Sequence, residues 1–537
     1  MQLSTLPCNA RKIGFLIRAM SFLIASSGCL STLAHAQSAG NLATTPLPSL
    51  TSGGGVNNAP PFQYSASADL SERYIDNAQG TPTSPIPDYD SRATLTLSAS
   101  EESSRTNASL SYSGSVDYFA RESVRPVFLN NLSANGVLSV LPDHFLFSAQ
   151  AFATPVYQSQ LGNIAPLGEA VAPGATSSLS NTYGFSLQPD LFFRLGDILR
   201  SDLIPGYSAV YFVEPAVTPS NITGTEHTQS LMERITSGSD FSRLQLGAIA
   251  DYSQMDQSSG GLTQRSATGN LSYAITQGFA LVANGGYQSV KASAVLIQPA
   301  SGPVLMGGVN FDLARLKGEV LAGEQYRSFS MAGHLLYQIS PRITLQAAAN
   351  DTVTTPLASL LGENSLLQSA VTALASGQLQ LPSSGVITSP QLYNIGLQNE
   401  IARIRTATAT FNYTLDNFTA AVTGFGTQQS ALTAVGKGQN QNLQSLGVTP
   451  SLTYQFGPDL SVTGDMYYIN QRQVVGADTD MQYDMTANYS LNNNIQLYLQ
   501  GSYLQRYSDA VLASYSLESG SASIASIRLG IRYQLSR

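Results

Sequence analysis

Apolar and polar residues alternate strictly along this chain in segments of about ten residues. In residues 108–118, the even positions hold alanine, leucine, tyrosine, glycine and valine, whereas the odd positions hold serine and aspartate. Similar alternation covers residues 243–252 and 495–503. Because neighbouring side chains of an extended strand point to opposite faces, each segment predicts a strand with one apolar face.

An internal repeat joins these segments in pairs. A tyrosine near the end of one segment precedes a turn rich in Gly, Pro, Asp or Asn, and an apolar residue then opens the next segment. Five copies lie at residues 273–279, 337–343, 413–418, 454–460 and 489–495. Short turns alternate with longer polar connections, among them 428–443, 471–480 and 352–400. Transmembrane barrels have this arrangement of turns and loops.

The pattern therefore predicts an all-β fold over residues 62–537, a transmembrane antiparallel up-and-down β-barrel of roughly 18 to 22 strands. An even number of strands in up-and-down order places both chain termini on the periplasmic side of a bacterial outer membrane. Strand starts are expected near Phe62, Arg92, Asn107, Asn131, Phe145, Thr182, Gly206, Thr228, Phe241, Arg265, Phe279, Pro303, Leu316, Arg327, Ile343, Ala402, Phe418, Leu446, Leu460, Met481, Ile495 and Ala522.

The longest connection, residues 352–400, carries leucines at helix-like spacing between Pro356 and Pro382. We expect a partly helical insertion that forms an external lid. The alternative, a segment folded into the lumen as a constriction, stays open because long loops usually have a function.

The N-terminal residues predict export. Arg11, Lys12 and Arg18 precede an apolar stretch and the sequence Ala34-His35-Ala36, so residues 1–36 resemble a removable signal peptide. A lipoprotein attached at Cys29 is the less favoured alternative. Residues 37–61 are uncharged and rich in Ser, Thr, Gly and Pro, which predicts a flexible low-complexity segment.

Composition supports a membrane location. Charged residues make up 11% of the chain, against about 25% in soluble proteins. The net charge of −8 argues against a nucleic-acid partner, and the expected partners are outer-membrane lipid, lipopolysaccharide and the barrel-assembly machinery. Since the chain has no Trp, tyrosine must form the aromatic girdles at the membrane interfaces. The candidates are Tyr273, Tyr337, Tyr413, Tyr454, Tyr489 and Tyr533.

The candidate chemistry is sparse. His144, His227 and His334 are predicted at a turn, near an outer loop and in the lumen wall, so they do not form a Ser-His-acid set. Both cysteines precede residue 37. The acidic pairs at 88–90 and 478–480 are interpreted as solvated loop charge. We therefore expect no enzyme, metal or cofactor, and a barrel-embedded hydrolase is the alternative from another class.

Alternation assigns a set of charged residues to the lumen wall, where they either line a pore or form a structural network of ion pairs. Both interpretations stay open. The candidates are Asp117, Asp190, Arg194, Arg243, Asp251, Lys317, Glu319, Asp465, Asp484, Arg528 and Arg532.

Several stretches resemble the outer-membrane barrels associated with PEP-CTERM and exopolysaccharide systems. The resemblance lies in residues 128–149, 183–193 and 241–246. It implies a channel or scaffold that exports or assembles a polysaccharide, with the polymer or its periplasmic export proteins as partners. A general diffusion porin and a surface adhesin displaying 352–400 are alternatives. A TonB-dependent receptor is disfavoured because residues 37–61 are too short for a plug.

Overall fold

The computed structural model describes residues 62–536 except for the gaps 82–83, 104, 122–125, 143, 158–178, 214–224, 258–259, 294–295, 297–299, 356–400, 433–441, 474–475 and 510–519. The predicted signal peptide, the segment 37–61 and almost all of the insertion 352–400, including its expected helix, lie outside the described residues.

The described residues form one antiparallel sheet of 22 strands, at the upper limit of the expected number. The strands are β1 Phe62–Ile75, β2 Asp88–Glu102, β3 Thr106–Phe119, β4 Val127–Leu141, β5 Phe145–Tyr157, β6 Leu179–Leu195, β7 Leu199–Val213, β8 Thr225–Ser237, β9 Leu244–Gln257, β10 Gly260–Thr276, β11 Phe279–Ala292, β12 Gly302–Asp312, β13 Leu316–Gln325, β14 Ser328–Ser340, β15 Ile343–Thr354, β16 Ala402–Leu415, β17 Phe418–Ala431, β18 Leu443–Gln455, β19 Leu460–Gln473, β20 Gly476–Ser490, β21 Ile495–Ser508 and β22 Gly520–Ser536.

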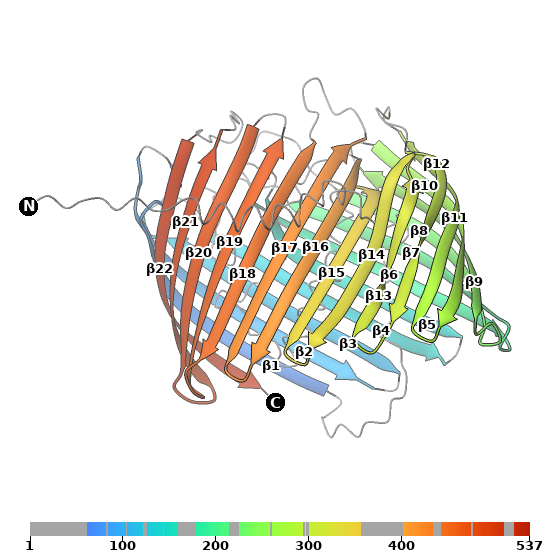
Figure 1. The fold of residues 1–537 in the computed structure, drawn as a ribbon. Coiled ribbons are helices and arrows are strands. Elements are labelled where there is room, and N and C mark those ends of the chain that lie inside the picture. The colour runs from blue at the N-terminus through green and yellow to red at the C-terminus, as the bar shows by residue number, and fades with distance from the viewer. Residues whose placement is uncertain are drawn as a thin grey trace, which may run out of the picture.

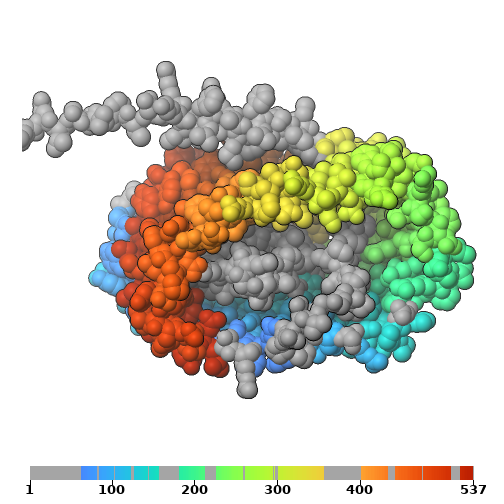
Figure 2. Space-filling model, turned by 60° about the horizontal axis from the view of Figure 1, so that its bottom comes forward, coloured from blue at the N-terminus to red at the C-terminus, as the bar shows by residue number. Residues whose placement is uncertain are grey.

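The sheet closes on itself through β1 and β22. Residues Ser65 to Ile75 of β1 pair antiparallel with Ser536 to Ser526 of β22, and β1 also pairs with β2 along its whole length. The first and last strands therefore lie side by side in a continuous wall (Figure 1), and the wall is oval when viewed toward its lower end (Figure 2). Closure satisfies the backbone donors and acceptors that lipid cannot bind.

Strands that follow short turns begin where the sequence predicts them. Phe145, Phe279, Ile343, Phe418 and Ile495 are each the first residue of a strand. Other starts differ from the expected ones: β7 begins at Leu199 instead of Gly206 although the β6–β7 turn is short, and β18, which follows a long connection, begins at Leu443 instead of Leu446. The predicted long connection 471–480 is wrong, because only 474–475 separate β19 from β20. Polar residues at these strand ends extend the sheet beyond its apolar belt.

The two ends of the barrel differ. At the turn end, which we define as the end with the β2–β3, β14–β15 and β20–β21 turns, every connection is short. The opposite end, the loop end, carries the longest connections. The six candidate girdle tyrosines all lie near the turn end: five are more than a third exposed, and Tyr413 is half-buried with its ring 5.9 Å from that of Phe418.

The outer face is apolar and the inner face is polar. Outward positions carry exposed Leu95, Leu305, Ile527 and Leu529, whereas buried inward positions are mostly Asp, Arg, Gln, Ser and Thr. Among the described residues, no helix is long and apolar enough to cross a membrane. The outer belt of exposed leucine, isoleucine and tyrosine matches the lipid-facing surface of a transmembrane barrel.

A charge placed on this belt should destabilise the barrel. Leu95 lies near the middle of β2 on the outer face, so Leu95→Arg should lower the free energy of unfolding by about 2–4 kcal/mol. Leu491, which is equally exposed in the β20–β21 turn, is the matched control, and Leu491→Arg should cost no more than about 1 kcal/mol. Urea unfolding in lipid vesicles, followed by circular dichroism, measures both. Equal costs would contradict a lipid-facing belt.

Candidate functional site

Charged residues form a continuous cluster on the inner faces of β22, β1, β2 and β3. We call this cluster the arginine wall, and its members are Asp69, Arg73, Asp90, Arg92, Asp117, Arg528 and Arg532. The strand register places opposite charges directly across from one another: Arg73 faces Asp90, Arg92 faces Asp117, and Asp69 faces Arg532. The pairing follows from the sequence because each residue lies at an inward position of its strand.

The ion pairs of the arginine wall are close and buried. Arg92 donates from Nε and Nη2 to the two oxygens of Asp117 at 2.6 and 2.8 Å, and Asp117 has no exposed surface. The Nη2 atom of Arg73 lies 2.8 Å from Asp90, and Nε of Arg532 lies 3.3 Å from Asp69. A buried charge needs such a partner, because desolvation of an isolated one costs several kcal/mol.

Tyr498 of β21 completes this cluster. A side chain at Gly530 would meet Cζ of Tyr498 at 2.3 Å, so the glycine leaves the space that the tyrosine ring occupies. The Tyr498 hydroxyl donates a 2.8 Å hydrogen bond to Asp69, and the guanidinium of Arg532 lies 5.5 Å from the ring centroid. The tyrosine thus links β21 to β1 across β22.

The wall changes course at the loop end of β15. Strand β15 pairs with β14 from Ile343 only as far as Ala349, yet it stays paired with β16 up to Thr354. Side chains from two distant strands contact the end of β15 and the residue after it. Gln264 of β10 donates a 2.7 Å hydrogen bond to the carbonyl oxygen of Val353, and the hydroxyl of Thr355, which follows β15, donates a 2.5 Å hydrogen bond to Glu226 of β8. The end of β15 therefore lies inside the barrel, against the inner faces of β8 and β10.

A hydrophobic cluster accompanies these contacts, and we call it the mouth cluster. It brings the loop ends of β15, β16 and β17 together with those of β9, β10 and β11. Its members are Met255, Leu262, Val290, Ala300, Tyr326, Val353, Ile401 and Leu432, all at most 3% exposed. Apolar packing across the interior narrows this part of the barrel at the loop end.

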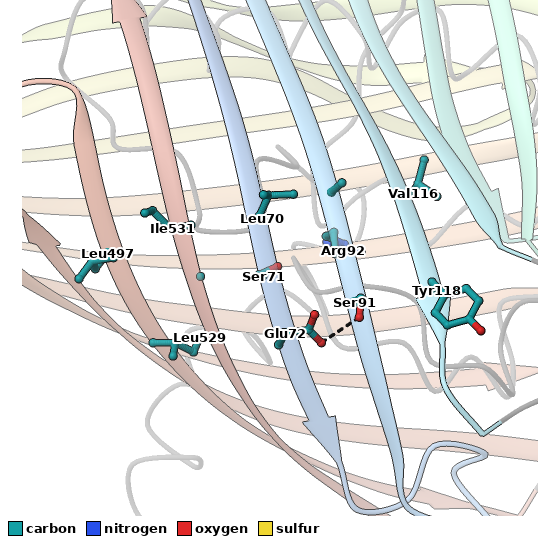
Figure 3. A pocket seen from close by; sticks show the side chains of 12 residues that line it. Leu70, Ser71, Glu72, Ser91, Arg92, Val116, Tyr118, Leu497, Leu529 and Ile531 are labelled. Atoms are coloured by element: carbon teal, nitrogen blue, oxygen red, sulfur yellow. Dashed lines mark hydrogen bonds between the residues drawn. The ribbon is translucent and has the colours of Figure 1, made fainter.

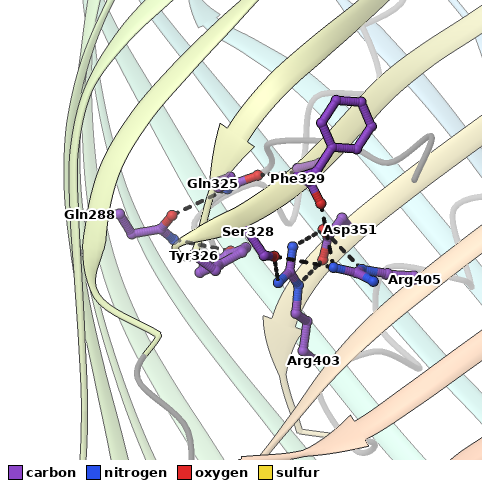
Figure 4. Close-up of polar contacts among 9 residues, drawn as sticks. Gln288, Gln325, Tyr326, Ser328, Phe329, Asp351, Arg403 and Arg405 are labelled. Carbon is purple, nitrogen blue, oxygen red and sulfur yellow. Dashed lines mark hydrogen bonds and ion pairs between the residues drawn. The ribbon is translucent and has the colours of Figure 1, made fainter. Parts of the chain in front are cut away.

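An ion-pair network supports the mouth cluster from one side (Figure 4). Arg403 donates from Nε to Asp351 at 2.7 Å and also bonds the same carboxylate through Nη2, while Nε of Arg405 lies 3.4 Å from Asp351. The Arg403 guanidinium lies 5.1 Å from the ring centroid of Tyr326, whose hydroxyl accepts 3.1 Å from Gln288. Burial, together with the Asp351 charge, raises the pKa of Tyr326, so this phenol stays protonated.

The structure distributes the predicted pore-lining residues over three settings. Asp117, Asp190, Asp251 and Arg528 are buried on the inner wall. Asp465 and Asp484 lie directly across from each other on β19 and β20, and Arg532 belongs to the arginine wall. Glu319 accepts a 3.4 Å hydrogen bond from the side-chain amide of Asn310. Arg194, Arg243 and Lys317 are exposed near the turn end. Arg243 lies one residue before β9, and its carbonyl oxygen still accepts a 2.8 Å hydrogen bond from the backbone N–H of Ala274 on β10.

Two acidic pairs predicted in loops lie in strands instead. Asp88 and Asp90 belong to β2, and Asp478 and Asp480 belong to β20. Asp478 is buried and lies 3.0 Å from Nε of Arg506. The prediction failed because both pairs continue the alternation of their strands past the apolar belt. The same alternation could have placed Arg73 and Arg92 inward, whereas the Arg403–Asp351 network had no signal in the sequence.

The three histidines after residue 37 lie apart. His144 is exposed in the β4–β5 turn, and His334 is on the inner side of β14. His227 is on the outer face, where its Nδ1 atom and the Tyr207 hydroxyl form a 3.0 Å hydrogen bond. Among the residues with described positions, no three His, Cys, Asp or Glu side chains form a group that could hold a metal ion.

No protein-family model and no curated protein matches the chain. Among solved structures it is similar to the siderophore receptor PirA from Acinetobacter baumannii, with 10% identity over 89% of this chain and 81% of that chain and a TM-score of 0.40. It is also similar to the siderophore receptor PirA from Pseudomonas aeruginosa, with 10% identity over 89% of this chain and 81% of that chain and a TM-score of 0.37. A third similar structure is OmpT, an outer membrane protein of Vibrio cholerae, with 9% identity over 88% of this chain and 97% of that chain and a TM-score of 0.28.

The closed antiparallel sheet, its apolar outer belt and its polar interior together define the class of protein. The chain is a large outer-membrane β-barrel.

Breaking one ion pair of the arginine wall should destabilise the barrel. Arg92→Leu leaves the Asp117 charge without its bidentate partner and should cost about 3–5 kcal/mol of unfolding free energy. The double variant Arg92→Leu with Asp117→Leu removes both charges and should recover most of that loss. Urea unfolding of the two single variants and the double variant measures the coupling. Additive losses would show that the pair is not coupled.

Proposed function

We propose that this barrel is an outer-membrane channel for a polar, weakly charged polymer, with a secreted polysaccharide as the cargo. The observation that carries the proposal is the pairing of charges on the inner wall, as in Arg92–Asp117, Arg73–Asp90 and Arg506–Asp478. The resemblance of residues 128–149 and 183–193 to barrels of exopolysaccharide systems supports the choice of cargo.

Paired charges suit a neutral cargo better than an ion. A ring of unpaired charges in a pore attracts ions of one sign, whereas an Arg and an Asp within 3 Å largely cancel each other's field. Between the pairs, the inner positions carry amides and hydroxyls such as Gln482, Gln500, Ser502 and Thr486. These groups can both donate and accept hydrogen bonds, as the hydroxyls of a sugar do.

The loop end supplies a constriction in this proposal. Gln264 and Glu226 hold the end of β15 against the opposite inner faces, and the mouth cluster excludes water from the contact. A general diffusion porin needs an open lumen, so the constriction favours a channel that opens for a particular cargo.

The first test is single-channel recording. The mature protein, purified in detergent and reconstituted in a planar bilayer, should conduct with little preference between cations and anions. A neutral dextran should block the current more than an anionic polysaccharide of similar length. Current that no polysaccharide blocks would point to a diffusion porin. A barrel that never conducts would refute the channel.

Weakening the constriction should enlarge the current. The double variant Gln264→Ala with Glu226→Ala removes both polar contacts to the end of β15 and should increase the unitary conductance. Gln471→Ala is the matched control, because it removes a buried glutamine of β19 that is not part of the mouth cluster. The same bilayer recordings compare the three proteins. Identical conductance in all three would exclude the end of β15 as the narrow point.

A further inference from the structure

The outer face near the loop end carries charges of different sign on different strands. On β1, beside the pocket shown in Figure 3, the exposed carboxylate of Glu72 accepts a 2.9 Å hydrogen bond from Ser91. On β10 and β11 the charges are the exposed cations Arg265 and Lys291. Charged groups at the edge of a membrane attract lipid headgroups of opposite sign, so the two regions favour different headgroups.

The two cations belong to adjacent strands and to the outer face. Gln264 and Val290, each next to one of them in the sequence, contact the interior, so alternation points Arg265 and Lys291 outward. Thr263 pairs with Lys291, and Arg265 is the next outward residue of β10. The cations are therefore diagonal neighbours, a relation in which two residues of an antiparallel pair lie about 7–8 Å apart.

The depth of these cations in the membrane follows from the neighbouring outward positions. Leu305 of the apolar belt, which is 69% exposed, pairs with Gly285, and Tyr287 lies two residues farther toward the loop end on β11. Arg265 pairs with the residue two positions beyond Tyr287, and Lys291 lies four positions beyond it. Exposed tyrosines are typical of the membrane interface, so the cations lie just outside the acyl chains. Because the long loops of such barrels are extracellular, this interface belongs to the outer leaflet.

Neither cation has an acidic partner among the described residues. The guanidinium of Arg265 lies 5.3 Å from the ring centroid of Tyr252, the residue opposite it on β9. Asp256 on the same face of β9 accepts a 3.1 Å hydrogen bond from the side-chain amide of Gln254. Arg265 and Lys291 therefore keep N–H groups that can donate to an external anion.

We propose that Arg265 and Lys291 bind a phosphate group of lipopolysaccharide in the outer leaflet. Lipopolysaccharide carries phosphates where its acyl chains join its sugar backbone, which is the depth of the two cations. The arginine can donate two parallel N–H bonds to a phosphate, and the lysine adds a positive charge. Thr263 and Ser289, which lie opposite the two cations, supply hydroxyl donors. The acyl chains of the same molecule cover the apolar belt below the cations, which a soluble phosphate ion cannot do.

Lipid binding measured by native mass spectrometry tests the proposal. The folded full-length mature barrel in detergent is titrated with lipid A that carries both phosphates, with the same lipid A after both phosphates are removed, and with phosphatidylglycerol. We expect the phosphorylated lipid A to bind about tenfold more tightly than either of the other lipids. The double variant Arg265→Gln with Lys291→Gln should lose this preference, and Arg265→Lys with Lys291→Arg should keep most of it.

Arg472→Gln is the matched control, because Arg472 is an exposed cation near the loop end of β19 whose opposite residues, Gln444 and Ala477, are uncharged. It should leave the preference intact, and circular dichroism checks that each variant is folded. Equal binding of phosphorylated lipid A and either other lipid by the unaltered protein would overturn the proposal. A preference that survives in the folded variant Arg265→Gln with Lys291→Gln, or displacement of the lipid A by inorganic phosphate, would do the same.

Discussion

The fold depends on the requirement that no backbone hydrogen-bonding group remain unpaired in lipid. A sheet can meet that requirement only by closing, and the eleven residue pairs from Ser65–Ser536 to Ile75–Ser526 accomplish it. Closure then fixes the face of every side chain, because a slip of one residue would exchange the inner and outer faces. Arg73 and Arg528 in particular would be moved into lipid by such a slip.

The arginine wall reinforces closure where the chain ends meet. Arg532 of β22 pairs with Asp69 of β1, and Arg528 of β22 lies 3.8 Å from Asp90 of β2, so ion pairs cross the seam between the first and last strands. Each pair has its short distance only in the observed register. Buried ion pairs add little net stability compared with apolar packing, but they penalise alternatives that separate the charges. Their contribution here is to the specificity of closure.

Much of the fold could be predicted from the sequence because alternation is a local signal. The turn after Tyr413 and the start of β17 at Phe418 needed only a few adjacent residues. Strand ends near the loops were harder, since Asp88 and Asp478 are polar residues that continue a strand beyond the apolar belt. The inward positions of Asp117, Arg528 and Arg532 followed from the same alternation, but the contacts at the loop end of β15 could not be predicted. Contact between Glu226 and Thr355 joins residues 129 positions apart, and no local pattern encodes it.

The inward course of β15 explains why the contacts that form the constriction can be weaker than the backbone hydrogen bonds that form the barrel wall. Beyond Ala349, β15 loses its backbone partners on β14, and side chains replace them: Gln264 binds the Val353 carbonyl, and Arg405 donates to the Phe329 carbonyl at 3.4 Å. A ladder of backbone bonds breaks only as a unit, whereas these contacts can be exchanged one at a time. Because the loop end of β15 keeps backbone pairing only with β16, it can change position together with the end of β16 at a lower cost than a strand that is paired on both sides, which the proposed channel requires.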